Sequence, residues 1–176
     1  LDDLRHKIGF VLQKSELFSE TIEQNIRWGD AEASDEEVRR AAEIAQADEF
    51  ISGFTEGYKD MITEKGSSLS GGQKQRLSIA RAIVKKPEIL IFDDSMSALD
   101  LSTDAKLQKA LHEKLKGTTV IMIAQRVASV MRADKIAVID NGRIAAFDTH
   151  DNLMKNCSVY RDIYNSQMRE GAEQVG

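Results

Sequence analysis

Cysteine and proline are scarce in this chain of 176 residues, and the shortage of cysteine excludes two classes of protein. The single cysteine, Cys157, cannot form an internal disulfide, and by itself it cannot build a zinc site, so the chain fits a reducing compartment. The proline content, one residue in 176, is well below the usual ~5%. This proline, Pro87, ends one helical pattern. Disulfide-stapled secreted domains and cysteine-rich zinc modules are therefore excluded.

Long apolar runs and a leader peptide are missing as well. The longest apolar stretches, residues 89–92 and 120–124, fall far short of the ~20 residues that a membrane-spanning helix needs. The first residues carry no basic patch followed by an apolar run, so we expect no signal peptide and no secretion.

Positive charge is not in excess either. Lys and Arg number 24 against 29 Asp and Glu, which gives a formal net charge of -5. A domain that binds nucleic acid by neutralising many phosphates is therefore not expected, whereas a single phosphate-rich small ligand is compatible with this charge. The apolar content of 41% is enough for a packed core, and one folded domain is expected.

Short apolar runs alternate with helical patterns along the chain. The apolar runs predict strands over residues 8–12, 89–92, 119–123 and 136–139. The spacing of the other apolar residues predicts helices over residues 34–50, 72–86, 102–115, 126–131, 151–155 and 158–169. Strands separated by helices in this way predict a parallel sheet covered on both faces, and Asn141-Gly142 predicts a hairpin after the last of them.

A glycine-rich segment, Leu69-Ser70-Gly71-Gly72-Gln73, precedes one predicted helix. Glycines allow close backbone approach, and the free N–H groups of a helix N-terminus favour phosphate oxygens. Taken alone, a Gly-Gly pair before a helix is more often a simple turn.

Two adjacent carboxylates, Asp93 and Asp94, follow the apolar run over residues 89–92. Open α/β sheets bind ligands at the carboxyl ends of their strands, and a hard cation such as Mg²⁺ would suit Asp93. Such carboxylates are often helix caps or surface groups, but Ser97-Ala98-Leu99-Asp100 directly behind them favours a functional interpretation.

In this order the segments resemble the motifs of the nucleotide-binding domain of ATP-binding-cassette (ABC) transporters. Gln13 matches the Q-loop, residues 69–73 the signature motif, residues 89–93 the Walker B strand and residues 97–100 the D-loop. The resemblance covers almost the whole chain and implies binding of ATP and Mg²⁺.

Two further segments resemble the exporter type, namely residues 17–26 and the X-loop-like Thr63-Glu64-Lys65-Gly66. The resemblance implies an α/β fold with an incomplete P-loop NTPase (RecA-like) parallel-sheet core and an α-helical signature subdomain. The helical subdomain would cover about residues 14–86, with residues 1–13 and 87–176 as parts of the core. The 176 residues would then form the C-terminal part of one ABC ATPase domain.

The family motifs also imply roles for single residues. Asp93 would hold Mg²⁺, and Gln13 would sense both the metal and the γ-phosphate while linking the site to the membrane domain. The signature motif would clamp ATP held on a second ABC nucleotide-binding domain, so that ATP lies between the two in a head-to-tail dimer. The ATP-binding residues implied in this way are Gln13, Ser70, Gly71, Gly72, Gln73 and Asp100.

Two catalytic positions depart from the family pattern. Asp94 stands where a glutamate normally follows the Walker B aspartate, and it is shorter by one methylene group. Gln125 stands at the switch histidine, where it can donate a hydrogen bond but cannot carry a proton's charge. The pair implies a degenerate site in one half of a heterodimeric exporter, whose intact signature completes the partner's site.

A third departure is larger, because no Gly-Lys dipeptide occurs in the chain and a P-loop has the form G-x-x-x-x-G-K-[S/T]. In the family this Walker A motif lies upstream of the region seen here. We therefore expect a truncated chain that binds ATP weakly or not at all by itself and that leaves apolar sheet surface uncovered.

The resemblance implies an ATPase segment that couples ATP-driven dimerisation to export, through coupling helices of a transmembrane domain at the cytoplasmic face of the cell membrane. It implies no nucleic acid partner and no direct insertion into the membrane. A different class of function is also open: a non-catalytic dimerisation or regulatory module. Chromosome-maintenance ATPases share the signature and Walker B motifs, but they insert long coiled coils, and no sustained heptads occur here.

Overall fold

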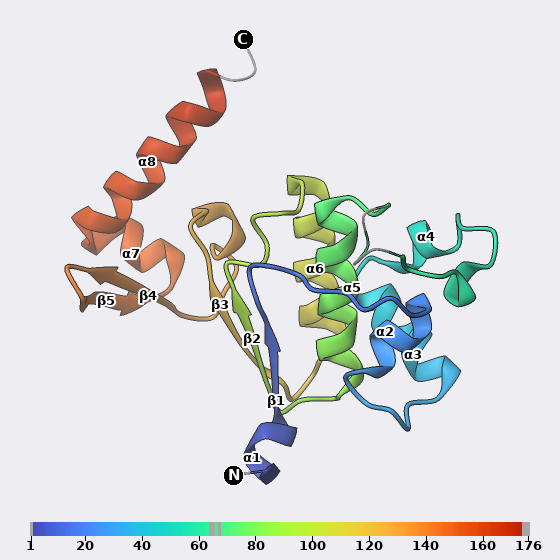
Figure 1. Ribbon diagram of the computed structural model, residues 1–176. Coiled ribbons are helices and arrows are strands. Elements are labelled where there is room, and N and C mark those ends of the chain that lie inside the picture. The colour runs from blue at the N-terminus through green and yellow to red at the C-terminus, as the bar shows by residue number, and fades with distance from the viewer. Residues whose placement is uncertain (1, 64–65, 67, 174–176) are drawn as a thin grey trace. The chain divides into compact units, whose positions relative to one another are not determined.

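The computed structural model describes residues 2–63, 66 and 68–173. The chain divides into two compact units, Leu1–Ile123 and Ala124–Gly176 (Figure 1). Within the described residues, no helix is both long and apolar enough to cross a membrane.

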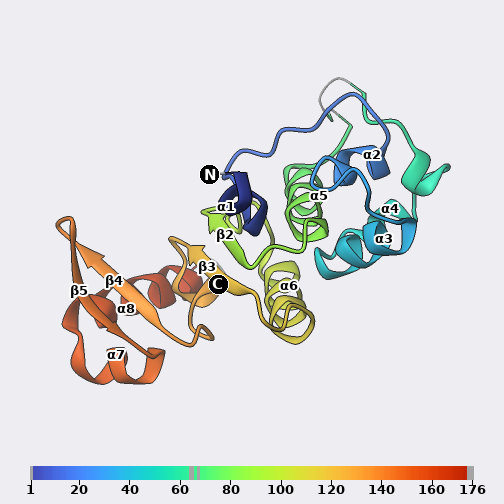
Figure 2. The same ribbon diagram turned by 90° about the horizontal axis from the view of Figure 1, so that it is seen from below.

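The first unit is built on a parallel sheet of three strands. These are β1 (Ile8–Val11), β2 (Ile89–Asp93) and β3 (Thr119–Ile123), in the order β1-β2-β3. Two long helices, α5 (Gly71–Val84) and α6 (Leu101–Lys114), lie on the same face of this sheet in both ribbon views (Figures 1 and 2). The α/β class and the parallel sheet are therefore confirmed.

The two faces of the sheet differ in burial. Leu90 and Phe92 of β2 are fully buried beneath the helices. Side chains alternate between faces along a strand, and on the opposite face Phe10, Ile121 and Ile123 are 51%, 46% and 52% exposed. Within the described residues of the first unit, the helices packed on this sheet lie on one side, so this unit does not cover the sheet on both faces as the sequence predicted.

A helical layer packs against α5 on the side away from the sheet. It comprises α2 (Ile22–Arg27), α3 (Asp35–Ile44), α4 (Asp48–Ile51) and the 3-10 turn η1 (Gly57–Lys59). A separate short helix, α1 (Asp2–Lys7), leads into β1. Helix α3 begins with a capping box formed by Ser34 and Glu37. The single helix predicted over residues 34–50 is wrong, because Gln46 adopts a left-handed φ of 59° that separates α3 from α4.

The start of the helical layer carries two stacked aromatic rings. Phe18 and Trp28 stack with their ring centroids 4.3 Å apart, and the indole N–H of Trp28 donates to the Glu20 carboxylate at 2.8 Å. Trp28 remains 57% exposed. Between α2 and α5, Gly29 is required by space, because a Cβ on it would lie 1.9 Å from the Arg81 carbonyl oxygen.

The second unit combines a hairpin with two helices. Strands β4 (Ile136–Asp140) and β5 (Arg143–Asp148) pair antiparallel around Asn141 and Gly142, whose φ angles of 47° and 74° confirm the predicted Asn-Gly turn. The strand over residues 136–139 was expected in the parallel sheet, and that expectation is wrong because the turn folds it back onto β5. Helices α7 (His150–Asn156) and α8 (Ser158–Glu173) follow, while the helix predicted over residues 126–131 is only a 3-10 turn, η3 (Val127–Ser129).

Candidate functional site

The carboxyl ends of the parallel strands bring Gln13 and Asp94 together. The side-chain amide of Gln13, just after β1, donates to a carboxylate oxygen of Asp94, just after β2, at 3.0 Å. The backbone N–H of Asp94 donates to the Ile123 carbonyl at the end of β3, at 2.9 Å. Asp94 has a φ of 46°, a left-handed conformation that aspartate tolerates better than most residues. Three strand ends thus fix the position of one carboxylate.

Asp93, the last residue of β2, is partly buried next to this pair. Because the Gln13 amide nitrogen is used by Asp94, its amide oxygen is directed away from that bond and can serve as an acceptor. Carboxylate and amide oxygens suit Mg²⁺, which commonly takes one or two protein ligands and completes its shell with water and phosphate. In the described part of the chain, no cluster of three or more His, Cys, Asp or Glu could hold a metal alone. Asp93 and Gln13 therefore fit an ion shared with a nucleotide.

The segment after Asp94 is held by short hydrogen bonds. The Ser97 hydroxyl donates to the Asp94 carbonyl at 2.7 Å. Asp100 is the N-cap of α6, where its carboxylate accepts from the Thr103 N–H at 2.9 Å and from the Thr103 hydroxyl at 2.7 Å. These hydrogen bonds, the hydroxyl foremost, lower the pKa of Asp100, so the group stays ionised at neutral pH. The Asp100 carboxylate is thus committed to a helix cap.

The glycine-rich segment forms the N-terminus of α5. Ser70 is the N-cap, and it exchanges hydrogen bonds with Gln73 in a capping box: Gln73 N–H to the Ser70 hydroxyl at 3.2 Å, and Ser70 N–H to the Gln73 amide oxygen at 2.8 Å. A Cβ placed on Gly71 would meet nothing within 4 Å, whereas one on Gly72 would lie 3.2 Å from the Ala98 carbonyl oxygen. The first turn of this helix is therefore open to a ligand at Gly71 and closed by packing at Gly72.

Within the first unit, the segment after β1 faces the start of α5 across a cavity of about 380 Å³. The cavity is lined by Gln13, Lys14, Ser15, Glu16, Gly71, Lys74, Gln75 and Ala98. Expected site residues from the Q-loop and the signature motif thus share one cavity, which the D-loop residue Ala98 also lines.

One residue of this region, Gln75, is absent from the sequence predictions. It is 1% exposed on α5, its amide nitrogen donates to the Leu12 carbonyl at 3.0 Å, and its amide oxygen accepts from the Ser15 hydroxyl. A polar residue among the buried positions of a helix was the one signal that could have indicated it.

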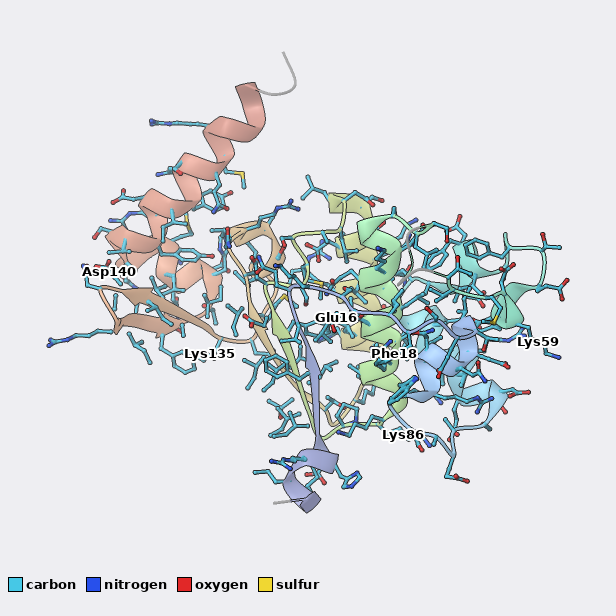
Figure 3. All side chains as sticks on the ribbon, viewed as in Figure 1. Glu16, Phe18, Lys59, Lys86, Lys135 and Asp140 are labelled. Atoms are coloured by element: carbon cyan, nitrogen blue, oxygen red, sulfur yellow. The ribbon has the colours of Figure 1, made fainter. Side chains whose placement is uncertain are left out.

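Arg81 is a second missed residue on the same helix. Its guanidinium donates to the Asn25 carbonyl at 2.8 Å and to the Glu16 carbonyl at 3.0 Å, and it lies 5.2 Å from the centre of the Phe18 ring. Glu16 and Phe18 lie beside α5 in Figure 3. Burial lowers the pKa of this guanidinium, although Glu20 raises it. Arg81 therefore holds the segment after the Q-loop against α5.

Gln125 belongs to the second unit, where the chain leaves β3. Its carbonyl accepts from the Gln167 amide nitrogen at 2.7 Å, and the Gln167 amide oxygen accepts from the Val127 N–H at 2.8 Å. Gln167 on α8 thus holds the backbone at Gln125, which the sequence had not indicated. Of the predicted X-loop, Glu64 and Lys65 lie outside the described residues.

Comparison with known proteins identifies the family. Residues 1–97, more than half of the chain, match the family model described as "ABC transporter". The chain belongs to the ABC transporter family. It is 47% identical over 170 residues to the uncharacterized ABC transporter ATP-binding protein YknU of Bacillus subtilis, covering 97% of this chain and 29% of that protein.

Further relatives of this ABC transporter chain come from eukaryotes and from solved structures. The mitochondrial potassium channel ATP-binding subunit of Xenopus tropicalis is 46% identical over 166 residues, covering 94% of this chain and 24% of that protein. A bacterial Atm1-family ABC exporter with ATP bound is similar in structure, with a TM-score of 0.88, 39% identity and coverage of 93% of this chain and 29% of that one. The chain thus spans less than a third of the length of these relatives.

Proposed function

We propose that this chain is the signature-bearing part of the ATP-binding domain of an ABC exporter, in which ATP binding and hydrolysis drive transport. The hydrogen bond of 3.0 Å between Gln13 and Asp94 carries the proposal, because it joins the Q-loop to the carboxylate after Walker B. The domain would consist of a helical subdomain over about residues 14–86 and of core parts from residues 1–13 and 87–176.

Asp93 and Gln13 would hold Mg²⁺ together with the phosphates of ATP. When bound, the metal neutralises charge on the transferred phosphoryl group. Asp94 would have to orient the attacking water, but it is one methylene shorter than glutamate and already accepts a hydrogen bond from Gln13. A displacement of about 1 Å can reduce the rate about 100-fold. The chain's own site is therefore proposed to be degenerate, and glutamine at position 125, where the family motif has a histidine, supports the same proposal from the sequence.

The signature end would serve a different ATP molecule. The N-terminus of α5 is capped by Ser70 and open at Gly71, so its free N–H groups can donate hydrogen bonds to phosphate oxygens of ATP on a second nucleotide-binding domain. That domain would carry the intact glutamate and histidine and perform most of the hydrolysis. The two chains would form a heterodimer with ATP between them.

The assembly would lie at the cytoplasmic face of a membrane, with transmembrane coupling helices as the second partner. Similarity to an Atm1-family exporter with ATP bound supports transport and ATP as the nucleotide. The exported substrate would be selected by the membrane segments.

The decisive experiment is ATP turnover by the full-length pair in lipid vesicles. Replacing the partner's catalytic glutamate with glutamine is expected to reduce turnover about 100-fold, because hydrolysis is assigned to the partner's site. Turnover that survives this change would place hydrolysis at Asp94 and overturn the asymmetric model. Because the 176 residues contain no Gly-Lys dipeptide, they are expected to show no ATPase activity by themselves.

A second function, from a different class, is that of a non-catalytic dimerisation or regulatory module. The two functions predict different native products. A much heavier, membrane-bound polypeptide in the source cells supports the exporter, whereas a soluble product near 19.6 kDa supports the module.

A further inference from the structure

One buried amide joins helix α5 to the segment that carries Gln13. Gln75 lies on α5 in the turn after the glycines, and only 1% of it is exposed. Its nitrogen donates to the Leu12 carbonyl at 3.0 Å, and its oxygen accepts from the Ser15 hydroxyl. Leu12 and Ser15 stand on either side of Gln13 in the sequence, so Gln75 holds the Q-loop at both ends.

The orientation of this amide is determined by its partners. If the amide were reversed, its oxygen would face the Leu12 carbonyl oxygen, and two acceptors would meet without a hydrogen between them. Breaking either bond would leave a buried polar group without its partner, which is more costly than losing an exposed bond. The Q-loop and α5 are therefore expected to move together.

Both ends of this connection lead to nucleotide chemistry. On one side, Gln13 donates to Asp94 at 3.0 Å in the chain's own site. On the other side, α5 begins at Gly71, and Gly72 packs on the Ala98 carbonyl oxygen at the D-loop. A shift of Gln13 would thus be passed through Gln75 to the first turn of α5.

We propose that Gln75 is a positioning residue that couples the Q-loop of this chain's own ATP site to the signature motif that completes the partner's site. This inference depends on the proposed function. Gln75 itself touches no substrate in this scheme. Its effect is exerted through Gln13 on one side and through the helix N-terminus on the other.

The test is a double-mutant cycle in the full-length pair, with ATP turnover, the KM for ATP and Tm as readouts. Gln75→Met keeps the length and removes both hydrogen bonds, and it is expected to lower kcat about tenfold while KM changes less than about twofold. In a Gln13→Ala background the same change is expected to have no further effect, because the coupled group is already gone.

The matched control is Ser78→Ala on the same helix. The Ser78 hydroxyl is buried and has no hydrogen-bond partner among the described residues, so its removal changes α5 without breaking a hydrogen bond to the Q-loop. Turnover is expected to stay within about twofold of the parent. A merely structural role for Gln75 would instead give a loss that tracks Tm and that multiplies with the Gln13→Ala effect.

Two further variants keep the inference open to refutation. Gln75→Glu can still accept from Ser15 but cannot donate to Leu12, and it is expected to lower kcat as Gln75→Met does. If Gln75→Met fails to assemble, Ser15→Ala removes one of the two bonds from the loop side, with an expected loss of about threefold.

The outcomes separate this inference from the proposed function. If Gln13→Ala lowers turnover and the Gln75 and Ser15 variants do not, the positioning role is wrong and the proposed function stands. If Gln13→Ala leaves turnover unchanged, the proposed role of the Q-loop itself fails.

Discussion

The start of α5 and the carboxyl end of β2 differ in how closely they follow the motifs of the ABC transporter family. At the start of α5, Ser70 caps the helix and Gly71 leaves its first turn open. At the end of β2, Asp94 is one methylene short of glutamate and its carboxylate is occupied by Gln13. In a head-to-tail dimer these two regions would serve different ATP molecules. Under the proposed function, this chain would lose its own catalysis and still be required for its partner's.

The largest expected effect comes from placing a negative charge at the open end of α5. Gly71→Asp is expected to lower the ATP turnover of the full-length pair about 100-fold, because the carboxylate would repel a phosphate. The same charge interacts favourably with the helix N-terminus, so Tm is expected to hold or rise. Gly71→Ala, which adds a Cβ into open space, is the uncharged control. A fall in Tm that matches the loss of turnover would contradict the ligand role.

The second-largest effect is expected from restoring the residues that the family motifs have at positions 94 and 125. Asp94→Glu combined with Gln125→His is expected to raise turnover about tenfold, since the longer carboxylate can reach the water and histidine can carry a proton. The measurement is steady-state ATP turnover with the partner's catalytic glutamate replaced, so that only this chain's site is read. Unchanged turnover would show that these two positions do not limit the site.

A smaller effect is expected from removing either of two capping boxes, and the two variants can be compared. Ser70 caps α5 and Ser34 caps α3 with the same reciprocal hydrogen bonds. Replacing either serine with alanine is expected to lower stability by about 1 kcal/mol, as a loss of Tm. Only Ser70→Ala is expected also to reduce turnover. Equal losses of turnover in both variants would mean that Ser70 acts through helix stability alone.

The smallest effect is expected at the ion pair of Glu37 and Lys86, which lies away from both regions and concerns stability alone. The ammonium of Lys86 and hydrogen bonds from Ser34 lower the pKa of Glu37 from its ordinary 4.5 to about 2. A lowered folded-state pKa stabilises the fold above pH 4.5, and this contribution is lost as the pH falls towards 2. Lys86→Met is therefore expected to flatten the acid side of a denaturant-midpoint curve over this range. An unchanged curve would show that the exposed pair contributes nothing, as many surface pairs do.

The strands and the helix that carry these two regions were largely predictable from local sequence patterns. Strands β1, β2 and β3 coincide closely with their apolar runs. Helix α5 begins at Gly71, the first of its two glycines, and ends before Pro87. The predictions failed at two places where the chain changes direction. Gln46 interrupts a continuous helical pattern with a positive φ. The Asn141-Gly142 turn was itself predicted, but it pairs β4 with β5, so β4 does not join the parallel sheet as expected.

The candidate site was predictable as residue types and not as contacts. Gln13 and Asp94 could be chosen one by one, but their hydrogen bond depends on the parallel register of β1 and β2. Gln75 and Arg81 are long polar residues on a helix, and their importance comes from backbone carbonyls that are distant in sequence. A sequence pattern shows how residues are spaced along one helix or strand, whereas each of these contacts joins two different segments of the chain.

The ring stack of Phe18 and Trp28 gives the molecule an optical reporter. Trp28 is the chain's single tryptophan, it is partly open to solvent, and its indole N–H is bound to Glu20. Phe18 also lies under the Arg81 guanidinium, so the stack is connected to α5. With tryptophan-free partners, the emission of this one indole would follow the segment after the Q-loop in real time, with no dye attached.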